Sequence, residues 1–142
     1  MKVLLAVDGS KNSMDAVECL IEHADWYREP PQVELVTVHL PIPNFRGVNK
    51  VVGRKEMQRY YAEEGQACLE KAAARLTKAG IPFAQRVLVG PIAETLERHS
   101  RDSKCDMILL GTRGMSATAN ALLGSTATKL MQLAKIPVLL VR

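Results

Sequence analysis

The sequence lacks a long hydrophobic run. Its N-terminal stretch, MKVLLAVDGS, carries only five consecutive apolar residues, Val3 to Val7, before Asp8 interrupts them. Such a run is too short to span a membrane and does not fit a secretory signal peptide. We therefore expect a cytoplasmic protein with no membrane association.

Cysteine is scarce, and its spacing does not indicate a metal site. The three cysteines are odd in number, far apart and each within or beside an apolar pattern: Cys19, Cys68 and Cys105. We interpret them as reduced thiols of the core. The histidines share no metal-ligand spacing with each other or with a cysteine: His23, His39 and His99. A metal site built from protein ligands is therefore not expected.

No continuous basic stripe is present either. The net charge is +4, but the basic residues are interspersed with acids, as in EEGQACLEKAAARLTK. Only RGVNKVVGRK is locally basic, and a solvated loop explains that segment. Nucleic acid is therefore not an expected partner.

The familiar catalytic and nucleotide motifs are missing. There is no G-x-S-x-G, no G-x-G-x-x-G after a strand and no phosphate loop, since GSTATK at 124–129 departs from G-x-x-x-x-G-K-[ST]. A phosphoacceptor receiver domain would need a second acid beside Asp8 and an aspartate after the third strand, where the chain reads VLVG. We therefore assign no catalytic residue.

Apolar periodicity indicates the fold class. Five short apolar runs predict strands at 2–7, 33–40, 83–89, 106–111 and 137–142. Helical spacing alternates with them at 13–27, 54–79, 91–101 and 125–134, with Ser13 available as the first N-cap. We expect one domain over 1–142, an α/β doubly wound parallel sheet with helices on both faces.

Three glycines and two hydroxyls follow the fourth predicted strand. In DMILLGTRGMSATANALLGST they are Gly111, Gly114, Gly124, Ser125 and Thr126. Backbone N–H groups can approach a phosphate closely where no Cβ intervenes, and a helix N-terminus favours anions. Each glycine alone could merely end a strand, make a turn or cap a helix. Together, at the expected switch point of the sheet, they favour a nucleotide site.

The spacing G-x-x-G, nine residues, G-[ST] resembles the nucleotide motif of the universal stress protein family. It is complete here as GTRG, MSATANALL and GS, and LLAVDGS, VTVHL, VGPIAETL and AKIPVLLVR resemble the family's other landmarks. The resemblance covers the whole chain. It implies a five-stranded sheet in the order 3-2-1-4-5, a homodimer and ATP binding.

The resemblance also implies which residues contact the nucleotide. Asp8 would lie on the nucleoside side of the cleft, lined by Ala6 and Val7, and the backbone of Leu40 would meet adenine. Gly111 would lie by the ribose, and the phosphates would be held by Gly114, Gly124, Ser125 and Thr126. Met115 replaces the Lys or Arg that many members carry, and Arg113 would supply that charge. A structural role for Asp8, in capping the first turn of the first helix, stays open.

Three functions are considered, and the first two are of different classes. The first is an ATP-binding regulatory protein of the stress response, with Mg²⁺ or Mn²⁺ carried by the nucleotide and little turnover. The alternative is a slow ATPase or autophosphorylating enzyme, in which Asp8 would take part. A dimerisation module without nucleotide is the third. The apolar segment PVLLVR at 137–142 is the expected dimer edge.

Overall fold

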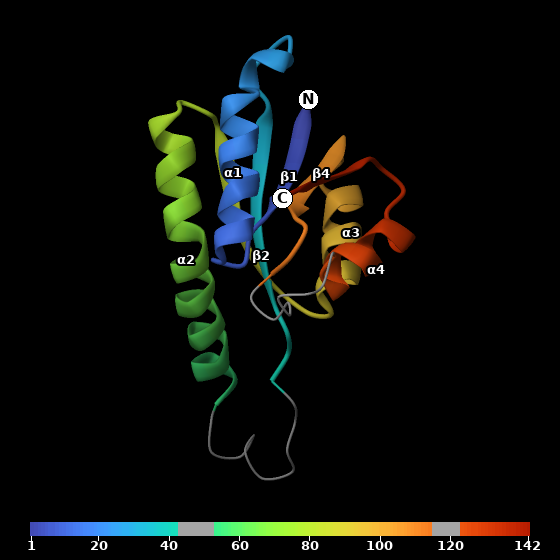
Figure 1. Cartoon of the computed structure of the whole chain (residues 1–142). Helices are drawn as coiled ribbons and strands as arrows, with labels where there is room; N and C mark the ends of the chain where they lie inside the picture. The colour runs from blue at the N-terminus through green and yellow to red at the C-terminus, as the bar shows by residue number, and fades with distance from the viewer. Residues whose placement is uncertain (43–52, 115–122) are drawn as a thin grey trace.

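A computed structural model describes residues 1–42, 53–114 and 123–142 (Figure 1). Its strands are β1 (Lys2–Ala6), β2 (Gln32–His39), β3 (Phe83–Val89), β4 (Met107–Gly111) and β5 (Val138–Val141). They form one parallel sheet in the order β3-β2-β1-β4-β5. The predicted fold class and strand order are confirmed.

Helices cover both faces of this sheet, as predicted. They are α1 (Lys11–Glu22), α2 (Arg54–Lys78), α3 (Ile92–Asp102) and α4 (Ser125–Leu133), with a short 3₁₀ helix, η1 (Ala24–Trp26), after α1. In Figure 1, α1 and α2 lie on one side of the strands, and α3 and α4 lie on the other. Among the described helices, none combines the length and apolar character that a membrane crossing requires.

The first helix begins earlier than the sequence pattern predicted. Its N-cap is Ser10, whose hydroxyl oxygen accepts a hydrogen bond from the Ser13 backbone N–H at 3.2 Å. Ser13, the predicted cap, is buried in the first turn and donates its own hydroxyl to the Ser10 carbonyl at 2.9 Å. Both serines can cap a helix, and the three-residue spacing from Ser10 to Ser13 favours Ser10.

Side-chain alternation along the strands produces two cores. On the face of α1 and α2, Val3 and Leu5 pack with Leu69. On the face of α3 and α4, Leu4 packs with Ile108 and other apolar residues. Because each central strand is buried on both faces, its sequence is almost continuously apolar.

Helix α1 approaches the end of β4 very closely. A Cβ placed on Gly111, the last residue of β4, would lie 2.5 Å from the carbonyl oxygen of Asn12 in the first turn of α1. A glycine is therefore required at this point for the packing of α1, whatever it contributes to a ligand. This contact fixes the start of α1 against the loop that follows β4.

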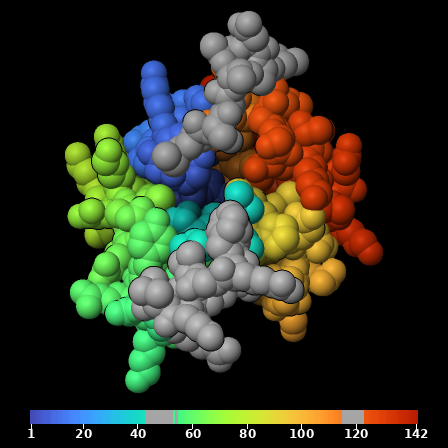
Figure 2. Space-filling model, turned by 90° about the horizontal axis from the view of Figure 1, so that it is seen from below, coloured from blue at the N-terminus to red at the C-terminus, as the bar shows by residue number. Residues whose placement is uncertain are grey.

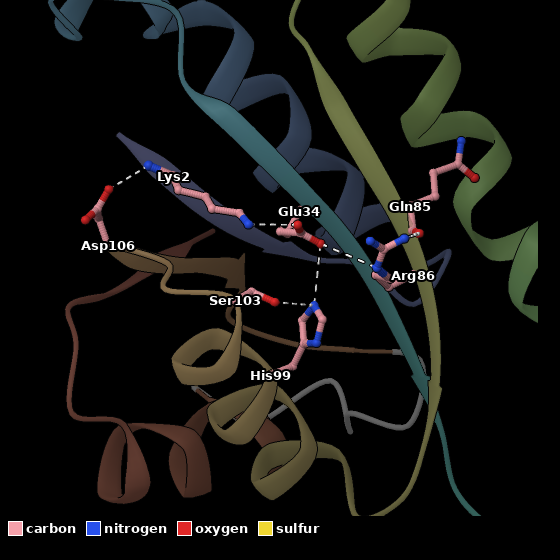
Figure 3. A network of polar contacts seen from close by, with 7 residues as sticks. All are labelled: Lys2, Glu34, Gln85, Arg86, His99, Ser103 and Asp106. Carbon is pink, nitrogen blue, oxygen red and sulfur yellow. Dashed lines mark hydrogen bonds and ion pairs between the residues drawn. The ribbon is translucent and has the colours of Figure 1, made fainter.

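A buried polar network lies on the α3 side of the sheet (Figure 3). Glu34 in β2 is only 6% exposed. Its carboxylate accepts Lys2 Nζ at 2.9 Å, with His99 Nε2 at 3.5 Å and Arg86 Nε at 3.9 Å. Burial alone would raise the pKa of Glu34, but the hydrogen bonds and charges of these partners outweigh it and lower the pKa below its ordinary value of 4.5.

The lowered pKa of Glu34 predicts acid sensitivity. A carboxylate whose pKa is lower in the folded state stabilises the protein above its unfolded pKa, and this contribution is lost as the pH falls through the folded value. We expect Glu34→Gln to lower the free energy of unfolding by about 1–3 kcal/mol at neutral pH. The difference in unfolding free energy between this variant and the wild type should shrink below about pH 4. Urea unfolding at neutral pH and below about pH 4 measures it.

The matched control is Glu63→Gln. Glu63 pairs with Arg59 on the exposed surface of α2, where an ion pair contributes little to stability. Its pH dependence should match that of the wild type. An equal loss in both variants would show that Glu34 has no special place in acid stability.

Candidate functional site

A cavity of about 450 Å³ opens at the carboxyl edge of the sheet. It lies where β1 has β2 on one side and β4 on the other, which is the switch point of the strand order. Figure 2 looks onto this edge, with the end of β2 in cyan near the centre, the green and yellow parts of the chain to its sides and the N-terminal (blue) and C-terminal (orange) parts above it. The volume is within the range of small-molecule pockets.

The cavity brings together nearly all of the residues that the sequence indicated. Its lining includes Ala6, Val7, Asp8, Gly111, Arg113, Gly114, Gly124, Ser125 and Thr126. Leu40 is the exception, because it is 63% exposed and lies outside the lining, whereas its predecessor His39 lines the cavity. Met115, the departure from the family motif, lies outside the described residues.

Asp8 joins the loop after β1 to the loop after β4. Its Oδ1 accepts the Ser10 backbone N–H at 3.0 Å, so it orders the turn before α1. A Cβ on Gly114 would lie 2.5 Å from Asp8 Oδ2. The absence of that Cβ lets the carboxylate approach the loop that the sequence assigned to phosphate. Asp8 therefore lies nearer to this loop than its expected place at the nucleoside end implied.

The start of α4 is tied to the end of β4. The Gly124 N–H donates to the Thr112 carbonyl at 2.7 Å, so this amide is already used within the protein. The following N–H groups, of Ser125 and Thr126, are in the first turn of α4, where intrahelical acceptors are missing. Together with their hydroxyls and the helix dipole, they can bind an anion.

The two sides of the cavity differ in polarity. Apart from the first turn of α4, the lining on the α3 and α4 side is apolar: Val38, Ile92, Leu96, Leu110, Leu123 and Ala127. On the α1 and α2 side it carries polar groups: Ser13, Thr37, His39 and Cys68. The cavity thus suits a ligand with a flat apolar part and an anionic part.

Cys68 and His39 are lining residues that the sequence reading did not identify. Cys68 was interpreted as a core thiol, as were Cys19 and Cys105, but only Cys105 is fully buried. Burial and the negative charges of Asp8 and Glu64 raise the pKa of the Cys68 thiol. Helical spacing gave the available signal, since Cys68 lies four residues before the buried Ala72.

Comparisons with known proteins agree with this architecture. A model of the "Universal stress protein family" matches residues 1–142. The "Universal stress protein YxiE" of Bacillus subtilis is 27% identical over 149 residues, covering 99% of this chain and 98% of that protein.

Solved structures with the same fold include the universal stress protein UspA from Lactobacillus plantarum. It has a TM-score of 0.81 and 18% identity, covering 100% of this chain and 97% of that one. A universal stress protein in complex with cAMP has a TM-score of 0.69 and 25% identity, with the same coverage of 100% and 97%. Since the family model spans every residue of the sequence, the chain belongs to the universal stress protein family.

Proposed function

We propose that this chain is an ATP-binding regulatory protein of the stress response that holds its nucleotide in the cavity at the carboxyl edge of the sheet. The observation that carries the proposal is the meeting of the loops after β1 and β4 around one cavity. The three cysteines are unpaired thiols, which is typical of the reducing cytoplasm and supports a location there.

The chemistry of the lining fits a nucleotide in one orientation, with its phosphates at the start of α4 and its base at the apolar wall. The first turn of α4, with Ser125 and Thr126, and the Arg113 side chain suit the phosphates. The apolar wall suits the faces of a base, and Asp8 lies between these two regions at the end of β1. The related protein that binds cAMP supports a purine nucleotide as ligand.

A divalent cation would accompany the phosphates. Asp8 supplies the one carboxylate among the described lining residues, which is too few for a protein-made Mg²⁺ site but enough to assist an ion that the phosphates already hold. We therefore assign Mg²⁺ or Mn²⁺ to the bound nucleotide, with Asp8 as its protein ligand.

ATP should stabilise the folded chain. Ligand at a hundred times its dissociation constant adds about 2.7 kcal/mol, or roughly 5–10 °C in Tm for a chain of this size. We expect Gly124→Val to lose this shift, because its branched side chain occupies the space beside the first turn of α4. Differential scanning fluorimetry with millimolar MgATP measures the effect.

Gly124→Ala is the matched control. The backbone of Gly124 is extended, with φ −72° and ψ 158°, and a Cβ would lie 3.4 Å from the Thr112 carbonyl oxygen. Alanine therefore fits, and this variant should keep most of the shift. The proposal fails if wild-type Tm does not respond to ATP, or if the valine variant responds fully while circular dichroism confirms its fold.

Slow ATP hydrolysis is the alternative function, and one contact favours it. The Asp8 carboxylate lies against Gly114, beside the expected phosphates, where it could orient water or a metal ion. The remaining polar groups near this loop are donors, which hold phosphate without activating water. We therefore favour retention of intact ATP.

Phosphate release distinguishes the two functions. We expect wild-type protein to release phosphate far more slowly than about one per second, the lower end of the range for kinases. Asp8→Asn keeps an oxygen to accept the Ser10 N–H and removes the charge. Faster release that disappears in this variant would establish the enzyme instead.

We further propose a homodimer built on β5. This strand is at one edge of the described sheet and pairs there with β4 only. Leu139 in β5 is 41% exposed, and Met131 and Leu133 of the neighbouring α4 are 55% and 38% exposed. An apolar edge strand of this kind favours pairing with a second copy.

A charge at this edge should dissociate the dimer. We expect twice the monomer mass of 15.6 kDa for the wild type in sedimentation velocity, and a shift to monomer for Leu139→Glu at the same concentration. Val89→Glu is the control, because Val89 is 42% exposed on the opposite edge strand β3. Dissociation by both variants, or a monomeric wild type, would exclude a dimer through β5.

A further inference from the structure

The Nε2 atom of His39 is a buried nitrogen with no hydrogen-bond partner among the described residues. His39 is the last residue of β2 and one of the residues that line the cavity. A buried polar atom without a partner costs about 1–3 kcal/mol. Native proteins rarely leave such an atom without a reason, and a ligand that satisfies it is one such reason.

Other polar side chains of the same wall already have partners within the protein. The Ser13 hydroxyl donates to the Ser10 carbonyl at 2.9 Å. Thr37 interacts with the thiol of Cys68 and by itself lowers the pKa of that thiol. The His39 nitrogen therefore stands out on this wall as a group available to a ligand.

The position of the His39 ring is well defined. The His39 carbonyl accepts the Gly90 N–H at 2.9 Å, which fixes the end of β2 to the turn after β3. The ring lies beside Tyr61 of α2, with 6.2 Å between the ring centroids. The Tyr61 hydroxyl in turn accepts the Ile42 N–H at 2.6 Å. An imidazole held in this way can hydrogen-bond a ligand with little loss of conformational freedom.

Strand order places His39 at the end of the cavity opposite the expected phosphates. The phosphate-binding groups follow β4, and β1 separates β4 from β2. Adjacent strands are about 4.8 Å apart, so the ends of β4 and β2 are about 10 Å apart. This separation matches the extent of a nucleoside. A nucleotide whose phosphates lie at α4 therefore directs its base toward His39 and the apolar Val38 beside it.

Resting on the proposed function, we infer that His39 Nε2 forms a hydrogen bond with a heteroatom on the edge of the nucleobase and thereby sets the affinity for the base. A neutral imidazole nitrogen can donate or accept, according to its tautomer, and nucleobase edges carry both kinds of partner. A site that uses a buried hydrogen bond to hold its ligand discriminates against molecules that lack the matching group.

The test compares ATP with inorganic tripolyphosphate, which carries phosphates and no base. Titration calorimetry measures both ligands with wild type and His39→Phe, which keeps a flat ring and removes the nitrogens. We expect the phenylalanine variant to bind ATP about tenfold more weakly, and to bind tripolyphosphate like the wild type. His39→Gln, whose amide can place a polar atom near the position of Nε2, should recover part of the ATP affinity.

His23→Phe is the matched control, because it makes the same replacement at the end of α1, outside the cavity lining. It should bind both ligands like the wild type. Wild-type protein that binds no ATP would overturn the proposed function and this inference with it. ATP binding that is unchanged in His39→Phe, or an equal weakening of ATP and tripolyphosphate, would overturn the role of His39 alone.

Discussion

The structure depends on the parallel pairing of β1 on both of its edges. Val3 pairs with Val33 of β2 on one side and with Met107 of β4 on the other. Parallel neighbours require crossover connections, and the one after β1 runs toward β2 whereas the one after β4 runs the opposite way, toward β5. Loops after β1 and β4 consequently diverge above one point, and the cavity occupies the space between them. Each feature of the candidate site depends on this pairing.

Small residues then determine how closely the surrounding elements approach. At Gly111 the first turn of α1 contacts the strand end, and at Gly114 the loop contacts the Asp8 carboxylate. The glycine motif therefore has a structural role in addition to any role in ligand binding. A Cβ at either position would meet protein atoms at 2.5 Å even without a nucleotide. Loss of binding after such a substitution would not by itself locate the ligand.

Polar groups are distributed differently at the two ends of the sheet. Near the amino end, Glu34 is surrounded by Lys2, His99 and Arg86, so its buried charge is compensated within the protein (Figure 3). At the carboxyl end, the His39 nitrogen and the first turn of α4 have hydrogen-bonding capacity that a ligand can satisfy. Compensated charge stabilises the fold, whereas available donors and acceptors favour binding.

The sequence alone determined the fold class and most of the residues around the cavity. Short apolar runs and helical periodicity depend only on local neighbours, so strands such as Phe83–Val89 were located within a residue or two. Gly111, Gly114 and Gly124 also lie within one short segment of the chain, so their pattern can be recognised without knowledge of the fold. The resemblance to the family added the strand order, which periodicity does not encode.

Only the tertiary structure decided which side chains from distant parts of the chain meet the glycine segment around the cavity. His39 and Cys68 come from β2 and α2, and no local pattern places them beside the loop after β4. The packing also leaves Leu40 exposed and places Asp8 next to Gly114. It pairs the Gly124 N–H with the Thr112 carbonyl in a hydrogen bond. Local sequence specifies periodicity and turns, but contacts between distant segments depend on how the helices pack on the sheet, and that arrangement exists only in the folded chain.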